Sequence, residues 1–493
     1  MKKPKIKSIG YGFYCILMII ISVLGFILYN LGNWVLDTWG LLSIDEIIFH
    51  LKVPLDGTNS DVVLDGINAC VPLAVLVLFL SIFLIIGLRN KHGKCMIALF
   101  LVAVIACGSA GRAAYEVYDE LDVKEYLVSQ KKESHFIEQN YVDPRTTKIT
   151  FPEQKRNLIY IYLESMESTF ASKEDGGGLD FNCIPELTKL AEENTNFSNT
   201  DQLGGALPFT DTTWTIASMT SQFTGLPLKV EVANDMDQQN RFMPGAKTIG
   251  DILNENGYIQ ELMIGSQKEF AGTDKLFLQH GFDKICDINS LKQEYSFKSN
   301  ELNQWGLDDY KLFELAKNEI TQLAQTGKFN FTMATIDCHM PKGFLCKYCP
   351  DTYENRYENI YACQSKLINS FIDWCKSQSW YENTTIVLVG DHPTMAQQYV
   401  NDVPSDYQRT TYNCFINSKI ETTQIKNRQF THMDMYPTTL AAMGFNIEGN
   451  KLALGTNLFS ELPTIIEKYG QDYINEEVQK SSEYLDKNIY QFN

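Results

Sequence analysis

The sequence predicts an α/β domain built on a mostly parallel sheet sandwiched by helices and preceded by an α-helical transmembrane region. From Asn157 onward, short runs of β-branched and aromatic residues alternate with longer amphipathic runs, the pattern typical of such sheets. Long apolar spans occur only before that point. At 493 residues the chain is too long for one ordinary core, so we expect two or more domains.

Residues 1–112 are expected to form about three transmembrane helices. Apolar spans run from about Tyr11 to Tyr29, from Ala69 to Leu88 and from Cys95 to Ala110, and about 20 apolar residues suffice to cross a bilayer. A cleaved signal peptide is the alternative for the first span. No small-residue cleavage site follows it, however, which favours a retained helix.

The loop charges predict the orientation. Four lysines precede the first span, and Arg89, Lys91 and Lys94 separate the second from the third, whereas residues 32–68 hold six acidic residues against Lys52. By the positive-inside rule the N-terminus is cytoplasmic. Three crossings then place everything after Arg112 outside the cytoplasm, although an even number of spans would reverse this.

Residues 113–156 are interpreted as a membrane-proximal helix and a linker arm broken at Pro144 and Pro152, and residues 157–493 as the large C-terminal domain. The strands expected in that domain are Leu158–Leu163, Tyr258–Ile264, Phe329–Ile336, Thr385–Val389 and Thr411–Ile416. The helices expected are Ile184–Glu193, Thr248–Asn256, Asp308–Gln325, Glu358–Ser379 and Met435–Met443.

Composition excludes some classes of function. The chain has 42 Lys+Arg against 60 Asp+Glu, a formal net charge of −18, which argues against nucleic-acid binding because that needs basic surface. Among 12 cysteines the one tight pair is Cys346 and Cys349, and no second CxxC completes a four-ligand zinc site. The pair is either a local disulfide or two loop thiols, and an extracytoplasmic location favours the disulfide.

The stretch from Arg156 to Glu167 contains an apolar run that stops at a carboxylate, Glu164. A short apolar run with polar flanks is typical of a buried strand in a parallel sheet. Ligands of open α/β sheets bind beyond the carboxyl ends of the strands, where Glu164 would lie. The alternative is a carboxylate that merely caps a helix.

Two further strand ends carry groups that bind metal or phosphate. Asp391 and His392 follow the run Thr385–Val389, and Asp337 and His339 follow the run that ends near Ile336. Carboxylate and imidazole ligands together suit Mn²⁺, Zn²⁺ or related ions. A single histidine is more often structural, so a functional role for His339 is supported only by its expected position beside Glu164, Asp391 and His392.

Threonines crowd a predicted loop-to-helix junction between Gly204 and Leu228, at Thr212, Thr213 and Thr215. Any one of them could simply cap the helix. The functional interpretation is a nucleophile that a metal activates and that faces a helix N-terminus, where phosphate binds well.

In this order and spacing, the motifs NLIYIYLES, TTWTIASM…GLP, FAGTDKLF, WGLDD, TIDCHMPKGF and VGDHPTM resemble those of phosphoglycerol transferases in the alkaline phosphatase/sulfatase superfamily. These are the membrane-anchored enzymes that modify periplasmic glucans and the lipoteichoic acid synthases. The likeness covers roughly Asn157 to Gly455 and is greater to the glucan-modifying branch. It implies a sulfatase-like fold in a multi-pass protein of the bacterial cytoplasmic membrane, with the catalytic domain on the periplasmic or extracytoplasmic side.

The resemblance assigns four metal ligands: Glu164, Thr212, Asp391 and His392. Thr212 would also be the covalent nucleophile, chosen over its neighbours for its spacing to the GLP motif, and His339 would contact the phosphoglycerol. The resemblance implies one divalent cation, Mn²⁺ first, with Mg²⁺ or Zn²⁺ as alternatives. The arginine that grips the headgroup in the synthases is missing from GSQKEFAGTDK, so the substrate-binding candidates are Lys268, Phe270, Trp305 and Asp337.

The implied reaction transfers phosphoglycerol from phosphatidylglycerol to a glycan or polyglycerophosphate acceptor through a phospho-threonine. A phosphoethanolamine transferase is one alternative, although those relatives usually read SDHG where this chain reads GDHP. An inactive scaffold is another, but it predicts a lost ligand, and all four are present. The formylglycine motif of type I sulfatases is not matched, because Leu187 replaces its arginine after Cys183. His432 and Asp434 could form a second metal site, but their segment is more simply a capped helix start.

Overall fold

The computed structural model describes residues 6–39, 44–52, 60–229, 241–340, 342–400 and 403–491. The chain divides into two compact units. The first comprises Met1–Ile44 and Asn59–Leu127, and the second comprises Asp45–Thr58 and Val128–Asn493.

Three long helices make up the first unit: α1 (Ile6–Trp39), α3 (Ser60–Gly87) and α4 (His92–Glu120). By length and composition, the segments Gly10–Thr38, Leu64–Gly87 and His92–Glu120 could each cross a membrane, and each includes most or all of a predicted span. Small residues bring α1 and α4 together, since a Cβ on Gly25 would lie 2.8 Å from that of Ala106. Such close approach is characteristic of helix pairs in membranes.

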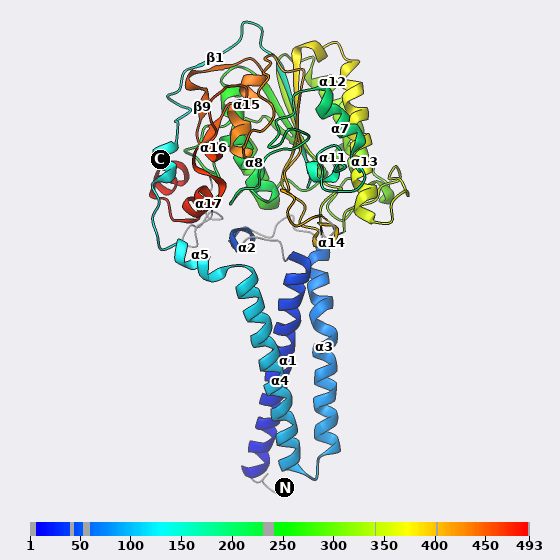
Figure 1. Cartoon of the computed structure of the whole chain (residues 1–493). Coiled ribbons are helices and arrows are strands. Elements are labelled where there is room, and N and C mark those ends of the chain that lie inside the picture. The colour runs from blue at the N-terminus through cyan, green and yellow to red at the C-terminus, as the bar shows by residue number, and fades with distance from the viewer. Residues whose placement is uncertain are drawn as a thin grey trace. The chain divides into compact units, whose positions relative to one another are not determined.

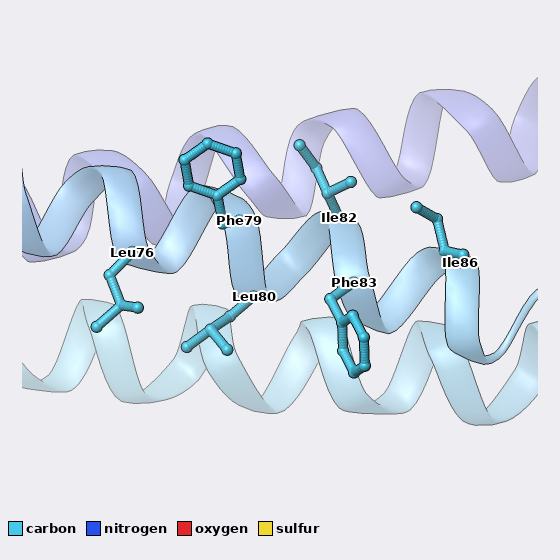
Figure 2. A pocket seen from close by; sticks show the side chains of 6 residues that line it. All are labelled: Leu76, Phe79, Leu80, Ile82, Phe83 and Ile86. Atoms are coloured by element: carbon cyan, nitrogen blue, oxygen red, sulfur yellow. The ribbon is translucent and has the colours of Figure 1, made fainter.

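The exposed face of α3 is apolar. Figure 2 shows the side chains that line a pocket along this helix: Leu76, Phe79, Leu80, Ile82, Phe83 and Ile86. Phe83 is 72% exposed and Phe79 is 64% exposed. In water such a surface would be costly, so it suits contact with lipid.

The second unit contains a six-stranded sheet in the order β4-β3-β5-β2-β6-β7. Its strands are β2 (Asn157–Leu163), β3 (Ile259–Ile264), β4 (Lys284–Cys286), β5 (Phe329–Ala334), β6 (Thr384–Gly390) and β7 (Asn413–Ile416). All neighbours are parallel except β6 and β7, which are antiparallel. The five predicted strands are confirmed. The sequence did not predict β4, because three residues carry too little pattern.

Helices cover both faces of this sheet (Figure 1). Leu158, Tyr160 and Tyr162 of β2 belong to one buried apolar cluster, and the alternate residues Ile159, Ile161 and Leu163 belong to the other. The first cluster includes side chains of α8 (Thr215–Thr224), α9 (Ile249–Asn254), α10 (Thr273–Leu278) and α15 (Met435–Ala442). The second includes side chains of α7 (Pro185–Glu193), α11 (Ile288–Glu294), α12 (Asp309–Leu323) and α13 (Arg356–Lys376).

Shorter elements surround this core. The predicted linker contains α5 (Val123–Ser129), α6 (Phe136–Asn140) and β1 (Ile149–Thr150), and β1 pairs with β8 (Asn446–Ile447), so its end is tied to the domain. The remaining elements are α2 (Ile44–Lys52), α14 (Gln397–Val400), β9 (Lys451–Leu452), β10 (Gly455–Thr456), α16 (Ile465–Tyr469), α17 (Gln471–Gln479) and α18 (Glu483–Leu485).

The disulfide favoured for Cys346 and Cys349 is absent. Their sulfur atoms lie 3.8 Å apart and both thiols are free, whereas a disulfide needs about 2.05 Å. The alternative of two thiols describes this part of the chain.

Candidate active site

Three neighbouring parallel strands end at the same edge of the sheet. In the register of the sheet Leu163 lies opposite Gly390, and β5 ends at Ala334 beside them. Glu164 and Asp391 therefore follow directly from adjacent strands. Parallel pairing has brought together carboxylates that are more than 200 residues apart in the sequence.

Glu164, Asp391 and His392 form one compact cluster of potential metal ligands. One donor atom from each lies within 4.8 Å of the others. His392 Nε2 is 3.6 Å from Glu164 Oε1 and 3.6 Å from Asp391 Oδ2. All three residues are buried, with at most 2% of their surface exposed. Desolvation therefore destabilises the charged form of each side chain unless a partner of opposite charge offsets it.

The turn after β2 orients both carboxylates. Ser165, which has a left-handed φ of 53°, donates its backbone N–H to Asp391 Oδ1 (2.8 Å) and its hydroxyl to Glu164 Oε1 (2.7 Å). The backbone N–H of Glu164 donates to Thr335 Oγ1 (2.9 Å), which ties this turn to the end of β5. The carboxylates are therefore held in place by groups that are not themselves ligands.

The electrostatics of the cluster favour a cation. Burial, and then the charge of Asp391, raises the pKa of Glu164 to about 8, and burial also raises the pKa of Asp391. Burial opposes a charged His392, but Asp391 and Glu164 outweigh it and raise its pKa. Glu164 Oε2 is buried without a hydrogen-bond partner in the described part of the chain. Two carboxylates, an imidazole and an unused oxygen fit a divalent cation.

The threonine-rich segment meets this cluster through Thr215. Its hydroxyl lies 3.3 Å from His392 Nε2, and it is the first residue of α8. Thr212 is fully buried, and its hydroxyl donates to the Phe209 carbonyl (2.8 Å). Nδ1 of the buried His432 lies 3.3 Å from Ser218 Oγ, on the same helix as Thr215. No local signal distinguishes Thr215 from its neighbours, because only the fold places it beside His392.

His432 itself is neutral and structural. Burial, and then the charge of His392, lowers its pKa to about 3. Its ring bonds Thr411 Oγ1 (2.8 Å), and Thr431 and Asp434 form a capping box at the start of the following helix. The prediction of a capped helix start is confirmed.

A row of rings is formed by Phe270 after β3, Trp305 just before α12 and His339 after β5. The Trp305 ring lies 4.5 Å from the His339 ring, and the Phe270 ring lies 5.2 Å from Trp305. His339 Nδ1 lies 2.8 Å from the carbonyl oxygen of Met340. The structure thus brings together His339, predicted as catalytic, and two of the four predicted substrate-binding residues, Phe270 and Trp305.

The other two substrate-binding candidates differ. Asp337 is buried, and its carboxylate accepts hydrogen bonds from Asn303 Nδ2 (3.0 Å) and from the backbone N–H of Asp309 (3.1 Å). A role in positioning the loop fits this environment better than substrate contact. Lys268 is half-buried, in the same loop as Phe270.

A buried ion pair, between Glu167 and Arg409, lies beside the segments that follow β2 and β6. Glu167 is fully buried and accepts hydrogen bonds from Arg409 Nε (2.9 Å) and Nη2 (2.5 Å). It also accepts the backbone N–H of Thr394 (2.8 Å), two residues beyond His392. The sequence analysis did not identify this pair, because nothing near Glu167 indicates a partner more than 200 residues away.

Comparison with known proteins agrees with this arrangement. A family model described as Sulfatase matches residues 156–445. Phosphoglycerol transferase I of Escherichia fergusonii is 29% identical over 371 residues, which are 72% of this chain and 46% of that protein. Phosphoglycerol transferase I of Citrobacter koseri is 29% identical over 398 residues, 78% of this chain and 49% of that protein. The chain spans about half the length of these relatives.

Solved structures support the fold. A protein of the alkaline phosphatase superfamily from Vibrio parahaemolyticus has a TM-score of 0.51 and 20% identity, covering 69% of this chain and 78% of that one. The integral membrane lipooligosaccharide phosphoethanolamine transferase A of Neisseria meningitidis has a TM-score of 0.51 and 13% identity, covering 87% of this chain and 84% of that one. Since the family model matches more than half of the sequence, this chain belongs to the sulfatase family.

Proposed function

We propose that this chain is a metal-dependent transferase that moves phosphoglycerol from phosphatidylglycerol to a hydroxyl of a glycan or polyglycerophosphate acceptor. The observation that carries the proposal is the buried cluster of Glu164, Asp391 and His392 beside the threonine-rich start of α8. The name of the relatives, phosphoglycerol transferase I, supports the transferred group.

Glu164, Asp391 and His392 would hold one divalent cation, with a threonine hydroxyl as a further ligand. Mn²⁺ is our first choice, and Mg²⁺ or Zn²⁺ are the alternatives, because the set mixes oxygen and nitrogen ligands. When bound, such an ion offsets phosphate charge and lowers the pKa of a coordinated hydroxyl.

Thr212 is the proposed nucleophile. Its hydroxyl first leaves the hydrogen bond with the Phe209 carbonyl and gives its proton to solvent, from which Thr212 regains a proton when the threonine is restored. The oxygen then attacks phosphorus, a P–O bond to Thr212 forms, and the P–O bond to diacylglycerol breaks. The N-terminus of α8 favours the anionic phosphate through its unpaired backbone N–H groups and its dipole.

His339 is the proposed acid and base. Its imidazole donates a proton to the oxygen of the departing diacylglycerol, and then takes a proton from the acceptor hydroxyl as that oxygen attacks the phospho-threonine. The bond between phosphorus and Thr212 breaks in this second step, which restores the threonine. Trp305, which packs on the His339 ring, would orient the imidazole and cover the glycerol headgroup together with Phe270.

The three apolar helices give the enzyme a membrane anchor. We propose a multi-pass protein of the bacterial cytoplasmic membrane, with the catalytic domain on the extracytoplasmic side where glycan acceptors lie. The anchor keeps the domain at the membrane that contains the lipid donor.

To test the proposal, the protein in detergent is incubated with phosphatidylglycerol or phosphatidylethanolamine labelled in the headgroup. Release of diacylglycerol from phosphatidylglycerol alone, together with a glycerophosphate adduct on a threonine peptide, is the expected result. Cleavage of phosphatidylethanolamine instead would identify a phosphoethanolamine transferase. Turnover of neither lipid with metal bound would refute the proposal.

A further inference from the structure

Three thiols from two segments of the chain meet on the side of the domain that carries α12 and α13. Cys346 and Cys349 lie in the loop between β5 and α13, and Cys363 lies on α13. Cys346 Sγ is 3.6 Å from Cys363 Sγ and 3.8 Å from Cys349 Sγ, and the three sulfurs all lie within 4.8 Å of one another. Cys346 and Cys363 are buried and Cys349 is half-buried.

The spacing of the sulfurs is that of a metal–thiolate site. A tetrahedral zinc ion with Zn–S bonds of about 2.3 Å holds its sulfurs about 3.8 Å apart. A disulfide requires about 2.05 Å and joins only two sulfurs. The separations of 3.6 and 3.8 Å match the metal geometry and involve all three thiols.

The surroundings stabilise thiolates. The backbone N–H of Cys346 donates to Cys349 Sγ (3.2 Å), and the backbone N–H of Tyr348 donates to Cys346 Sγ (3.4 Å). Lys347 Nζ lies 4.5 Å from the centre of the Tyr310 ring, which belongs to the same apolar cluster as Cys346 and Cys363. Three thiolates and a divalent cation carry one net negative charge, and the positively charged Lys347 is the residue next to Cys346 in the sequence.

We propose that Cys346, Cys349 and Cys363 bind one thiophilic divalent cation, of which Zn²⁺ is the best match. Each thiol gives up its proton to solvent, so three sulfur–metal bonds form and three protons are released for each ion bound. Among the described residues no histidine or carboxylate joins the three sulfurs in this cluster, and water takes the fourth position. The site is separate from the Glu164 cluster and its binding of metal does not depend on the proposed reaction.

The ion would hold the loop that carries His339. The backbone N–H of Gly343 donates to the His339 carbonyl (3.0 Å), and that of Phe344 donates to the Asp337 carbonyl (2.7 Å). Cys346 follows two residues later, so the thiolate site fastens this segment to α13. The consequence for catalysis rests on the function proposed for His339, because a loosened loop would misplace its imidazole.

Cobalt binding tests the proposal directly. The full-length protein, reduced and freed of metal, is titrated with Co²⁺, whose thiolate complexes show a charge-transfer absorption in the near ultraviolet. We expect one thiolate-bound Co²⁺ per chain, displaced by one Zn²⁺. The absorption should be lost in Cys346→Ala and Cys363→Ala. It should remain in Glu164→Gln, which alters only the other cluster.

A matched control lies on the same helix. Cys375 is also buried on α13 but outside the cluster, so Cys375→Ala should bind Co²⁺ as the wild type does. The half-buried Cys349→Ser is a milder variant, in case the alanine variants fail to fold. A wild-type protein without the absorption, an absorption that survives loss of these thiols, or a disulfide between any two of them in protein purified without reductant would overturn the assignment.

Discussion

The Thr215 hydroxyl lies 3.3 Å from Nε2 of His392, whereas the Thr212 hydroxyl donates to the Phe209 carbonyl at 2.8 Å. The two hydroxyls therefore have different partners, which suggests different roles. If Thr212 is the nucleophile and Thr215 only orients His392, the phospho-threonine will form in Thr215→Ala but not in Thr212→Ala.

Replacing Thr212 by alanine should reduce transfer by about 10³-fold or more, because the covalent step loses its nucleophile. Thr215→Ala should lower the rate less and still form the phospho-threonine. The measurement is diacylglycerol release, combined with mass spectrometry of the threonine peptides. Thr213→Ala is the matched control. An adduct on Thr215, or full activity in Thr212→Ala, would show that the wrong threonine was chosen.

Removal of metal should abolish activity and lower thermal stability. In the described structure Glu164 and Asp391 are buried within 4.8 Å of each other through their ligand atoms, and a cation that binds only the folded state stabilises it by mass action. Mn²⁺ added to chelator-treated protein should raise the melting temperature of the wild type but not of Glu164→Gln. Asp373→Asn, which changes an exposed carboxylate on α13 outside every cluster of potential metal ligands in the described residues, is the control. An equal shift in Glu164→Gln would place the ion elsewhere.

Variants of His339 and Trp305 should have different kinetic effects, one on the chemical step and the other on substrate binding. His339→Asn should lower kcat by about 10²- to 10⁴-fold, the range for a general acid or base, and should flatten the pH profile. Trp305→Leu should act mainly on KM, because it removes a ring beside the substrate position. Steady-state kinetics with phosphatidylglycerol would measure both. An unchanged pH profile in His339→Asn would mean that another group transfers the proton.

The ion pair of Glu167 with Arg409 should be a large contributor to stability. Arg409→Leu leaves a fully buried carboxylate without its partner, and the free energy of unfolding should fall by about 3 to 5 kcal/mol. Arg145→Leu removes a more exposed ion pair with Asp143 and should cost about 1 kcal/mol or less. Urea unfolding of both variants gives the comparison. Equal losses would contradict this ranking.

Stability should depend on pH through Asp309. Burial raises the pKa of this carboxyl to about 7, against about 3.9 in an unfolded chain. The folded state therefore holds the proton more tightly. The resulting stabilisation is full below about pH 4 and is lost as the pH rises through about 7, at up to about 1.4 kcal/mol per pH unit.

Asp309→Asn removes this titration, so its free energy of unfolding should fall less steeply than that of the wild type between about pH 5 and pH 7. The exposed Asp373→Asn, on α13, should keep the wild-type slope. The measurement is urea unfolding at a series of pH values. Parallel slopes in all three proteins would exclude Asp309 as the titrating group.

Much of the molecule could be predicted from local pattern. Apolar runs of 5–8 residues predicted five of the six strands of the main sheet, and the longest apolar runs predicted the three helices that could cross a membrane. The local motif from Thr431 to Pro437 predicted the capped helix start that precedes α15. The order and spacing of the motifs predicted the family.

Long-range contacts decided the rest. No local pattern could pair Glu167 with Arg409, place Thr215 rather than Thr212 against His392, or bring Cys363 to the Cys346–Cys349 pair. The sequence by itself determined which elements form and which residue types end them, because these depend on neighbours along the chain. Only the tertiary structure decided which side chains meet, because parallel pairing sets distances between strands that the sequence separates by a hundred residues or more.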